Sequence, residues 1–523
     1  MSTPAHVYLT TAIDYANGPP HMGHALEKIG ADTVARYRRL KGESVHFVIG
    51  MDEHGLNVLQ SAEAAGISPQ AWVDGIAESF LEMWTRLGIS NDDFIRTTQP
   101  RHRVAVEEMI RRLHDAGDLY LATYASYYCV GCEVYKTEDE LVPVEGEQPS
   151  SPTPADAGGG TRTVAHLRCP LHPTRPIVWM EEENWFFRLS RYRDRLLALI
   201  DEKPSFVQPE IRRNEIRNVL AGGLEDISVS RRRLPWGIPW PDHPDHTVYV
   251  WIDALTNYLS AVGFPDDRYH NFWPATMHVI GKDITRFHCI YWPAMLMSAG
   301  LPLPDTVWAH GFLTFEGRKL SKSAGVSIDL GEAIERHGPD ALRYYLIRDM
   351  PWNGDGDFSW NRFDDRYNAE LANDLGNLAN RALSMIERYR GGTIPDGART
   401  WLDDRTLDAL ARYGAAMDAN LLHQGVAAAL ELTSAGNGFV EERAPWQQAK
   451  DPDQAAALDA TLASLARAVV AIATMLSPVM PVKMRELLSR FAVAEPPLLA
   501  RLDSLELAGR PVHRGDVLFP KSA

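Results

Sequence analysis

The sequence predicts an α/β protein in which a parallel sheet is split by an insertion and followed by an all-α region. Three observations predict this class. Residues 6–49 follow a strand–helix–strand pattern. Strand-like runs return only at residue 247, beyond a stretch of different composition that begins near residue 120. From about residue 366 onward, strand-like runs disappear and apolar residues recur at helical spacing.

Length and charge narrow the function classes. The chain has 523 residues, of which 45% are hydrophobic and 23% charged, values typical of a soluble globular protein. At roughly 100–200 residues per domain, a multidomain enzyme is a better match to this length than a simple binding module. The 53 Lys and Arg residues against 69 Asp and Glu residues give a net charge of −16. This balance argues against sequence-blind coating of nucleic acid or anionic membranes, although it permits one basic patch.

No targeting or membrane segment is expected. The first basic residue is Lys28, so the N-terminus lacks the positive region of a secretory signal. The longest uncharged apolar stretch near the C-terminus, residues 468–482, is 15 residues long and contains Pro478 and Pro481. Such a stretch is too short and too interrupted to span a bilayer, and we expect a cytoplasmic protein.

The first three predicted elements form a βαβ unit. Residues 6–13 are rich in β-branched and aromatic side chains, apolar residues then recur at helical spacing up to Gly42, and residues 45–49 form a continuous apolar run. In an open parallel sheet the ligand crevice lies at the carboxyl ends of the strands, where residues 14–23 and 50–55 fall. The first strand is not followed by GxGxxG, so a dinucleotide-binding fold is not supported.

The middle of the chain reads as an insertion into this sheet. Gly, Pro and Ser make up 9 of the 15 residues at 146–160, which predicts a mobile loop. Strand-like runs return at residues 247–252 and 276–280, so about a hundred residues separate the two halves of the sheet. The helical region that ends the chain has breakers at Gly391, Gly392 and Pro445 and is predicted to be a bundle.

Two motifs suit a nucleoside triphosphate. His21 and His24 flank Gly23 at the start of the first helix, where free backbone N–H groups favour phosphate. Residues 318–325, RKLSKSAG, place Lys319 and Lys322 after the last candidate strand, and such lysines can neutralise charge that develops on a polyphosphate. Taken singly, each motif has a simpler interpretation: a packed or surface histidine pair, and a solvated turn.

A third motif suits a metal. Cys129 and Cys132 form CxxC, and Cys169 and His172 form CxxH, a donor set that fits four-coordinate, structural zinc. The 36 residues between the two halves exceed the common spacing, and a redox-active CxxC remains an alternative. Cys289 is predicted to be a packed thiol.

Together these motifs resemble those of the class I aminoacyl-tRNA synthetases and, within that class, the methionyl-tRNA synthetase family. The residues that carry the resemblance follow the family's order: Ala12-Ile13-Asp14-Tyr15-Ala16-Asn17-Gly18, His21-Met22-Gly23-His24, Asp52-Glu53-His54-Gly55, Tyr249-Val250-Trp251-Ile252-Asp253-Ala254, Gly281-Lys282-Asp283-Ile284, Phe287-His288, Tyr291-Trp292-Pro293-Ala294, Lys319-Leu320-Ser321-Lys322-Ser323, Asn377-Leu378-Ala379-Asn380-Arg381 and Ala444-Pro445-Trp446.

The resemblance implies a two-step reaction. Methionine and Mg²⁺-ATP give methionyl-adenylate and pyrophosphate, and the acyl group then passes to the 3′ adenosine of initiator or elongator tRNA(Met). The residues permit this chemistry, because a carboxylate is already a nucleophile and needs no general base. The implied catalytic residues are His21, His24, Lys319 and Lys322. The implied ATP-binding residues are His21, Gly23, His24, Gly281, Asp283 and Lys322. The implied methionine-binding residues are Ala12, Ile13, Tyr15, Asp52, Trp251, Ala254, Leu255, Tyr258 and His288.

The resemblance also supplies the remaining expectations. It supports one structural zinc ion at Cys129, Cys132, Cys169 and His172, and it assigns Asn377, Arg381 and Trp446 to the anticodon. Read without it, Trp251, Tyr258 and Trp446 would be ordinary core residues. The implied divisions are a Rossmann-like catalytic domain at 1–118 and 231–325, a zinc-knuckle connective insertion at 119–230, a stem-contact region at 326–365 and a helical anticodon-binding domain at 366–523. We expect a monomer that binds no membrane.

Other readings share part of these signatures. Leucyl, isoleucyl and valyl synthetases carry much larger editing insertions, for which this chain has no room. A cysteinyl enzyme would have a cysteine ahead of HxGH, but the first cysteine here is Cys129. A small-molecule nucleotidyltransferase would not need the helical region. A catalytically inactive tRNA-binding protein would not need the complete histidine and lysine sets.

Overall fold

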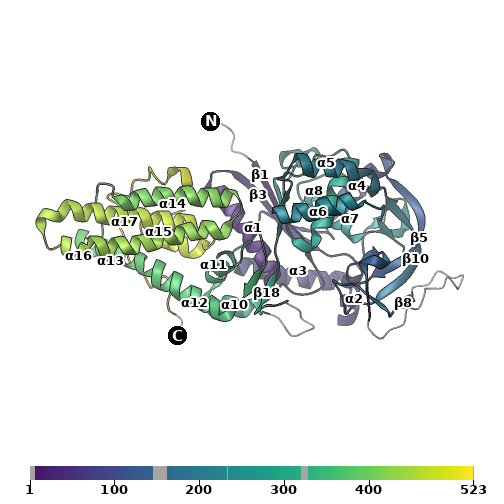
Figure 1. The fold of residues 1–523 in the computed structure, drawn as a ribbon, viewed down its shortest axis with the longest axis horizontal. Coiled ribbons are helices and arrows are strands. Elements are labelled where there is room, and N and C mark those ends of the chain that lie inside the picture. Colours follow the sequence, from purple (N-terminus) through teal and green to yellow (C-terminus); the bar gives the residue numbers. More distant parts are fainter. Residues whose placement is uncertain (1–5, 145–161, 233, 320–327, 522–523) are drawn as a thin grey trace.

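The computed structural model describes residues 6–144, 162–232, 234–319 and 328–521. The molecule is elongated, with the sheets at one end and a helical bundle at the other (Figure 1). The predicted Rossmann-like fold with an insertion and a C-terminal bundle is confirmed.

The large sheet has seven strands, and every ladder in it is parallel. Its order is β11 (Val207–Gln208), β17 (Val307–His310), β16 (Met277–Gly281), β1 (His6–Thr11), β3 (Ser44–Asp52) and β2 (Asp14–Tyr15), with β4 (Asp93–Arg96) paired to β3.

Helices cover both faces of this sheet. Successive strand side chains point to opposite faces, and Val7 and Leu9 of β1 join one apolar core while Tyr8 joins the other. The helices on the first face include α1 (Met22–Leu40), α3 (Pro69–Arg86), α10 (Leu330–His337) and α11 (Pro339–Asp349). Those on the second include α4 (Pro100–Asp115), α5 (Arg193–Glu202), α6 (Glu210–Gly222), α7 (Val250–Leu255), α8 (Asn257–Ser260) and α9 (Trp292–Ser298).

The insertion carries a second sheet, which is antiparallel and built on one long strand pair. In that pair β5 (Leu119–Cys129) lies beside β10 (Ile177–Phe187) along their whole length, from Leu119 opposite Phe187 to Cys129 opposite Ile177. The other strands are β6 (Val134–Lys136), β8 (Arg162–Val164) and β12 (Ile227–Ser228), and the short strands β7 (Val142–Pro143) and β9 (Leu167–Arg168) pair separately. The expected mobile loop at 146–160 lies outside the described residues.

Most of the later part of the range predicted for the insertion, 119–230, belongs to the large sheet and its covering helices. After β10 the chain passes through η2 (Leu189–Tyr192) and α5, and then β11 pairs with β17 and forms the edge of the large sheet. This edge strand is only two residues long, which explains why no periodic signal for it is visible in the sequence.

One strand prediction was wrong in part. Of residues 247–252, only the first two belong to β15 (His243–Val248), which pairs with β13 (Ser230–Arg231) and β14 (Pro239–Trp240). Residues 250–252 instead open α7, because a short apolar run that is buried on all sides fits a helix as well as a strand. The strand predicted at 276–280 is confirmed as β16.

Short helices and one small sheet complete the part of the molecule outside the bundle. They comprise η1 (Glu138–Glu140) in the insertion, α2 (Leu56–Ala65) after β3, η3 (Asp267–Asn271), η4 (Lys282–Ile284) and η5 (Phe287–Tyr291) around β16, and a small sheet of β18 (Leu313–Phe315), β19 (Arg318–Lys319) and β20 (Gly356–Phe358). The bundle comprises α12 (Trp360–Arg366), η7 (Tyr367–Leu375), α13 (Gly376–Arg390), α14 (Trp401–Asp418), α15 (Leu422–Arg443), α16 (Pro445–Gln448), η8 (Pro452–Gln454), α17 (Ala455–Leu476), α18 (Pro481–Ser489) and η9 (Leu499–Arg501).

One segment, Pro452–Leu476, is long and apolar enough to cross a membrane by length and composition alone. Its most apolar window has a mean hydropathy of 1.6, yet 72% of that window is buried in the fold. Helix α17 packs against α13, α14, α15 and α18, so its apolar surface faces other helices and it forms the core of the bundle.

The bundle is attached to the large sheet through a buried ion pair. Arg343 of α11 and Asp32 of α1 are both fully buried, with 2.7 Å between Arg343 Nη2 and Asp32 Oδ2. The same guanidinium donates hydrogen bonds to the carbonyl oxygens of Pro478 and Val479 in the turn between α17 and α18, and to that of Leu87 after α3. Although burial alone would raise it, Arg343 and Arg36 hold the pKa of Asp32 below its usual value.

Replacement of Arg343 by Met should destabilise the protein by about 3 kcal/mol, because Asp32 and three carbonyl groups lose a buried partner while Arg36 still pairs with Asp32. The shift of the urea-unfolding midpoint measures this loss. Arg405→Met on the exposed face of α14 is the control and should change stability by less than about 0.5 kcal/mol. Equal shifts for the two variants would contradict a role for the ion pair.

Candidate functional site

The predicted motifs converge at the carboxyl ends of three adjacent parallel strands. Strand β1 lies between β16 and β3, and the Ala12 N–H continues the ladder by donating to the Val279 carbonyl at 2.9 Å. In β2, Tyr15 is the register partner of Asp52 in β3. The chain segments that follow these strands therefore surround one crevice, as expected for an open parallel sheet.

A cavity of about 710 Å³ occupies this crevice. All nine residues predicted for methionine line it, namely Ala12, Ile13, Tyr15, Asp52, Trp251, Ala254, Leu255, Tyr258 and His288. Asp283 lines it as well, whereas His21, Gly23, His24 and Gly281 are not among its lining residues. The fold thus brings together, from four segments of the chain, the residues that are predicted to bind methionine. Their contacts with methionine itself stay a prediction.

Asp52 is the chemically most distinctive group in the cavity wall. Its side chain is buried, and among the described residues Oδ1 has no hydrogen-bond partner. Burial, and then the nearby carboxylates of Asp253, Glu133 and Glu53, raise the pKa of Asp52 well above its usual value. A buried carboxylate among other carboxylates is stabilised by a cation, so this wall favours a positively charged group in the cavity.

Two lining residues form a neutral, rigid pair. His288 Nδ1 donates to the Ile284 carbonyl at 3.0 Å, so its Nε2 is left to accept the hydrogen bond from the Tyr258 hydroxyl at 2.7 Å. Burial lowers the pKa of His288 to about 4, so the ring is uncharged at neutral pH. His288 lies in the π-helical segment η5, an element often found at functional sites.

Aromatic stacking forms another wall. The Trp251 and Phe287 rings stack with centroids 3.7 Å apart and an interplanar angle of 4°. Phe287 lies next to His288, and both rings of the stack line the cavity. An aromatic wall beside a neutral imidazole suits an apolar, polarisable side chain such as a thioether.

A buried network beneath this wall was not predicted from the sequence. Asp253 accepts hydrogen bonds from His54 Nδ1 and His102 Nε2, each at 2.6 Å, and His102 Nδ1 lies 2.9 Å from Ser260 Oγ. Burial alone would raise the pKa of Asp253, but the two imidazoles lower it to about 2. Asp253 and His54 belong to motifs that carry the family resemblance, but His102 comes from α4 and no local pattern identifies it.

His21 and His24 cap helix α1. His21 Nδ1 accepts from the backbone N–H of Gly23 and His24, and His24 Nδ1 accepts from the His21 N–H. The two rings stack with centroids 3.7 Å apart. Because each Nδ1 accepts a hydrogen bond, each neutral ring carries its proton on Nε2, and both Nε2–H groups are donors of the kind that bind phosphate oxygens.

Gly281 ends β16, and Asp283 lies in the short helix η4 that follows it. A Cβ atom at Gly281 would lie 2.6 Å from Asp283 Oδ1, so glycine allows the carboxylate to fold back over the strand end. The adjacent Lys282 pairs with both oxygens of Asp355 at 2.7 Å. These contacts fix the turn that lies beside the cavity.

The second basic motif starts on the β18–β19 hairpin, where Lys319 is the register partner of Thr314. Lys322 lies outside the described residues. The base of the hairpin is held by Asp357, which accepts from Thr314 Oγ1 and the Gly317 N–H, each at 2.7 Å.

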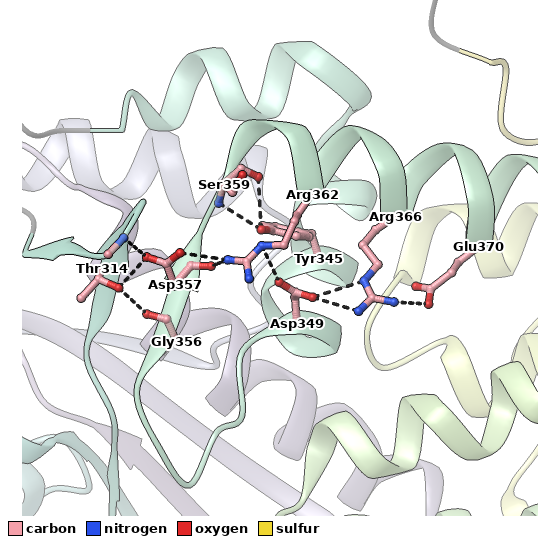
Figure 2. Close-up of polar contacts among 10 residues, drawn as sticks. Thr314, Tyr345, Asp349, Gly356, Asp357, Ser359, Arg362, Arg366 and Glu370 are labelled. Atoms are coloured by element: carbon pink, nitrogen blue, oxygen red, sulfur yellow. Dashed lines mark hydrogen bonds and ion pairs between the residues drawn. The ribbon is translucent and has the colours of Figure 1, made fainter.

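Figure 2 shows how this base is tied to the start of the bundle. Arg362 contacts Asp357 and Asp349, and Arg366 contacts Asp349 and Glu370. Alternating charges therefore run from the hairpin along α12 and into η7.

Four side chains in the insertion are positioned to bind one metal ion. The donor atoms of Cys129, Cys132, Cys169 and His172 all lie within 4.8 Å of one another. Cys132 Sγ lies 3.6 Å from Cys169 Sγ and 3.1 Å from His172 Nδ1. Tetrahedral coordination with Zn–S bonds of about 2.3 Å would separate two sulfurs by about 3.8 Å, so the donors fit such an ion. Hydrogen bonding from Cys132 lowers the pKa of the Cys129 thiol to about 4.

The residues predicted for the anticodon come from α13 and α16. Asn377 Nδ2 donates to the Asn373 carbonyl, and Arg381 pairs with Glu441 near the end of α15 at 2.5 Å. Trp446 follows five residues later in α16, at the end of the bundle away from the sheets (Figure 1), and is 38% exposed. Exposed Trp and Arg side chains are both groups on which unpaired bases can stack.

Two descriptions of known families match the chain. The family described as tRNA synthetases class I (M) matches residues 7–383, and the anticodon binding domain of methionyl tRNA ligase matches residues 390–522.

Several relatives are similar over almost the whole chain. The methionine–tRNA ligase of Thermotoga maritima is 42% identical, with 98% of this chain and 80% of that protein covered. That of Streptomyces coelicolor is 41% identical, with 98% and 96% covered. A solved structure of Mycobacterium tuberculosis methionyl-tRNA synthetase in complex with methionyl-adenylate has a TM-score of 0.92 at 38% identity, and covers 99% of this chain and 100% of that one.

The four side chains positioned to bind a metal ion, here called the metal cluster, depend on a glycine at position 131. A Cβ atom there would lie 2.6 Å from His172 Cγ. Gly131→Ala should therefore displace His172 and weaken metal binding by about tenfold to a hundredfold, as measured by competition with a chromogenic chelator. Gly222→Ala is the control, because a Cβ atom there meets nothing within 4 Å. Equal metal affinity in the two variants would show that His172 does not hold the metal.

Proposed function

The chain belongs to the methionine–tRNA ligase family of class I tRNA synthetases, and from this membership we propose how its residues divide the chemistry. As a member of that family the chain activates methionine with ATP and joins it to tRNA. The observation that carries the residue assignment is the buried oxygen of Asp52, which has no hydrogen-bond partner among the described residues and lies in a cavity wall that also offers aromatic rings and a neutral imidazole.

The first step requires alignment of the reactants and stabilisation of negative charge rather than a general acid and base. A carboxylate oxygen of methionine attacks the α-phosphorus of ATP, the bond from that phosphorus to the bridging oxygen of the β-phosphate breaks, and pyrophosphate leaves. The nucleophile is already ionised, so the protein has to align it and stabilise the charge on the pentavalent phosphorus.

Asp52 binds the α-ammonium group of methionine in this proposal. The ammonium gives the buried carboxylate the cation that its surroundings favour, and a charge-assisted hydrogen bond fixes the amino end of the substrate. The thioether then lies against Trp251, Tyr258 and His288, and Ala12, Ile13, Tyr15, Ala254 and Leu255 complete the pocket.

The phosphates lie at the amino end of α1. The Nε2–H groups of His21 and His24 and the backbone beside Gly23 hold the polyphosphate, and Gly281 and Asp283 hold the adenosine at the next strand end. Lys322, supported by Lys319, neutralises the charge of the leaving pyrophosphate, and Mg²⁺ accompanies ATP as in other polyphosphate reactions.

The cysteine cluster is proposed to hold one zinc ion with a structural role. Three thiolates and an imidazole are ligands that zinc prefers, and four protein ligands leave no open position for catalysis.

The bundle is proposed to read the CAU anticodon through Asn377, Arg381 and Trp446. For Arg381 to contact a base it would have to exchange its present partner, Glu441.

The domain boundaries, oligomeric state and location are also proposals. We assign residues 1–118 and 231–325 to the catalytic domain, 119–230 to the insertion, 326–365 to the stem contact and 366–523 to anticodon binding. The separate core of the insertion supports its distinction from the large sheet, whereas β11, α5 and α6 lie within 119–230 but pack in a core of the large sheet. A monomer in the cytoplasm suits this organisation.

Amino-acid-dependent ATP–pyrophosphate exchange, measured with each of the twenty amino acids, tests the function directly. Methionine alone should support exchange. A response to cysteine or to a branched aliphatic amino acid instead would overturn the proposal.

Methionine binding should depend on pH through Asp52. Because the pKa of Asp52 is raised in the folded protein, its carboxyl group is protonated as pH falls and then cannot pair with the ammonium. The affinity for methionine should therefore rise with pH, which calorimetry from about pH 6 to pH 8.5 can measure. Asp52→Asn should bind weakly and lose this dependence; the same slope in both proteins would rule out Asp52 as its source.

Trp446→Ala should slow aminoacylation of tRNA at least about fivefold and leave ATP–pyrophosphate exchange unchanged, because stacking on a base contributes about 1–3 kcal/mol. Trp401 is a matched control, since it is also 38% exposed on the bundle. If Trp401→Ala slows aminoacylation as much as Trp446→Ala does, the anticodon assignment fails.

A further inference from the structure

The residue that follows Cys132, the second cysteine of the metal cluster, belongs to the insertion, but it also lines the cavity of the large sheet. Glu133 is buried, at 4% exposure, and adopts a left-handed backbone conformation with φ = 55°. A left-handed conformation is unfavourable for a glutamate and persists only where surrounding contacts hold it. In the sequence, Glu133 belongs to none of the motifs that carry the family resemblance, and its spacing from other residues did not identify it.

The Glu133 carboxylate joins the insertion to two parts of the large sheet's crevice. Its Oε1 accepts a hydrogen bond from the Tyr15 hydroxyl at 2.8 Å and from the Asn57 N–H at 2.7 Å. Tyr15, Asn57 and Glu133 all line the 710 Å³ cavity. One carboxylate oxygen thus fixes both the ring hydroxyl of a predicted methionine contact and the first turn of α2.

Helix α2 depends on this carboxylate for its amino-terminal cap. Its N-cap residue is Gly55, which has no side chain to accept from the first backbone N–H groups. An acceptor from elsewhere in the fold can satisfy these donors, and a negative charge at this helix end is favoured by the helix dipole. Glu133 supplies both.

The fit around the carboxylate is tight. At Gly55, where φ is 109°, a Cβ atom would lie 2.5 Å from the Tyr15 hydroxyl oxygen and 2.6 Å from Glu133 Oε2. Glycine is therefore required both by its backbone conformation and by the approach of these two side chains.

The loop that carries Glu133 is attached on both sides. The Asn57 side chain donates to the Val130 carbonyl at 3.3 Å, and Arg231 donates to the Glu133 carbonyl at 3.4 Å. Within the loop, the Cys132 N–H donates to Cys129 Sγ at 3.4 Å. The geometry of residues 129–133 is thus transmitted directly to α2 and to Tyr15.

We propose that Glu133 is a positioning residue for methionine: it holds the Tyr15 hydroxyl and the start of α2 so that the cavity wall beside Asp52 keeps its shape. Tyr15 and Asp52 are register partners in β2 and β3, so a displaced Tyr15 opens the wall next to the carboxylate that receives the ammonium. The metal cluster thereby contributes to amino-acid affinity through the residue next to Cys132. This inference rests on the proposed assignment of the cavity to methionine.

Glu133→Ala in the full-length, metal-loaded protein tests the proposal. Loss of a buried charged hydrogen-bond acceptor should raise both the methionine Kd, from calorimetry without ATP, and the methionine KM in exchange by about tenfold to a hundredfold. The ATP KM and the content of one metal ion per chain should not change. A merely structural defect would raise the ATP KM as well or release the metal, and either result would overturn the proposal.

A double-mutant cycle with Tyr15→Phe tests whether Glu133 acts through the Tyr15 hydroxyl. The effects of the two substitutions on methionine Kd should be strongly non-additive, since removal of either side chain breaks the same hydrogen bond. Additive effects would contradict the proposed route.

Two further variants keep the test decisive. Glu133→Gln retains an acceptor oxygen and nearly the same shape, so it should fold even if the alanine variant does not, and it should weaken methionine binding less than the alanine substitution. Glu181→Ala, at an exposed carboxylate on β10 of the same insertion, should bind methionine like the wild type. Wild-type methionine affinity in both Glu133 variants would refute the inference, whereas failure of the wild type to bind methionine at all would refute the proposed function.

Discussion

The buried contact between Arg343 and Asp32 is the constraint on which the arrangement of the two ends of the molecule depends. Asp32 lies on α1, whose first residues carry the histidine pair and which packs between the large sheet and α11. Arg343 reaches from α11 to Asp32 and also to the turn between α17 and α18 of the bundle. A buried charge that loses its partner is costly, so this contact allows only one way of packing the bundle against α1. The helix that presents the histidines is thereby fixed relative to the surface on which Trp446 lies.

The crevice itself is organised by buried carboxylates in different states. Asp253 is kept ionised by two imidazoles, whereas Asp52 has a raised pKa and an oxygen without a hydrogen-bond partner among the described residues. The first is therefore satisfied within the protein and supports the wall, and we propose that a ligand satisfies the second. The difference arises from tertiary contacts, since His54 and His102 approach Asp253 from β3's carboxyl end and from α4. The same physical effect, desolvation of a charge, thus acts in one case on a carboxylate that is paired within the protein and in the other on a carboxylate that we propose to bind substrate.

The ends of helices have a similar double role. His21 caps α1 through Nδ1, so its neutral ring carries the proton on Nε2, and we propose that this N–H group donates to phosphate. At α2 the N-cap is a glycine, and the missing acceptor comes from Glu133 in the insertion. The insertion that carries the four metal-donor side chains and the cavity of the large sheet consequently share one carboxylate.

By itself the sequence determined the α/β class, the insertion and the helical bundle, because hydrophobic periodicity is a local property of the chain. Motif spacing indicated the four metal donors, and the family resemblance supplied nine residues, all of which lie among those that line the cavity. Local periodicity was not sufficient for residues 250–252, which form a helix, or for the two-residue strand β11. Only the tertiary structure decided that His102 would reach Asp253, that Arg343 would reach Asp32 and that Glu133 would reach Tyr15. These contacts join residues 118 or more positions apart, and whether a buried polar group finds its partner depends on how separate elements pack rather than on the residues beside it in the chain.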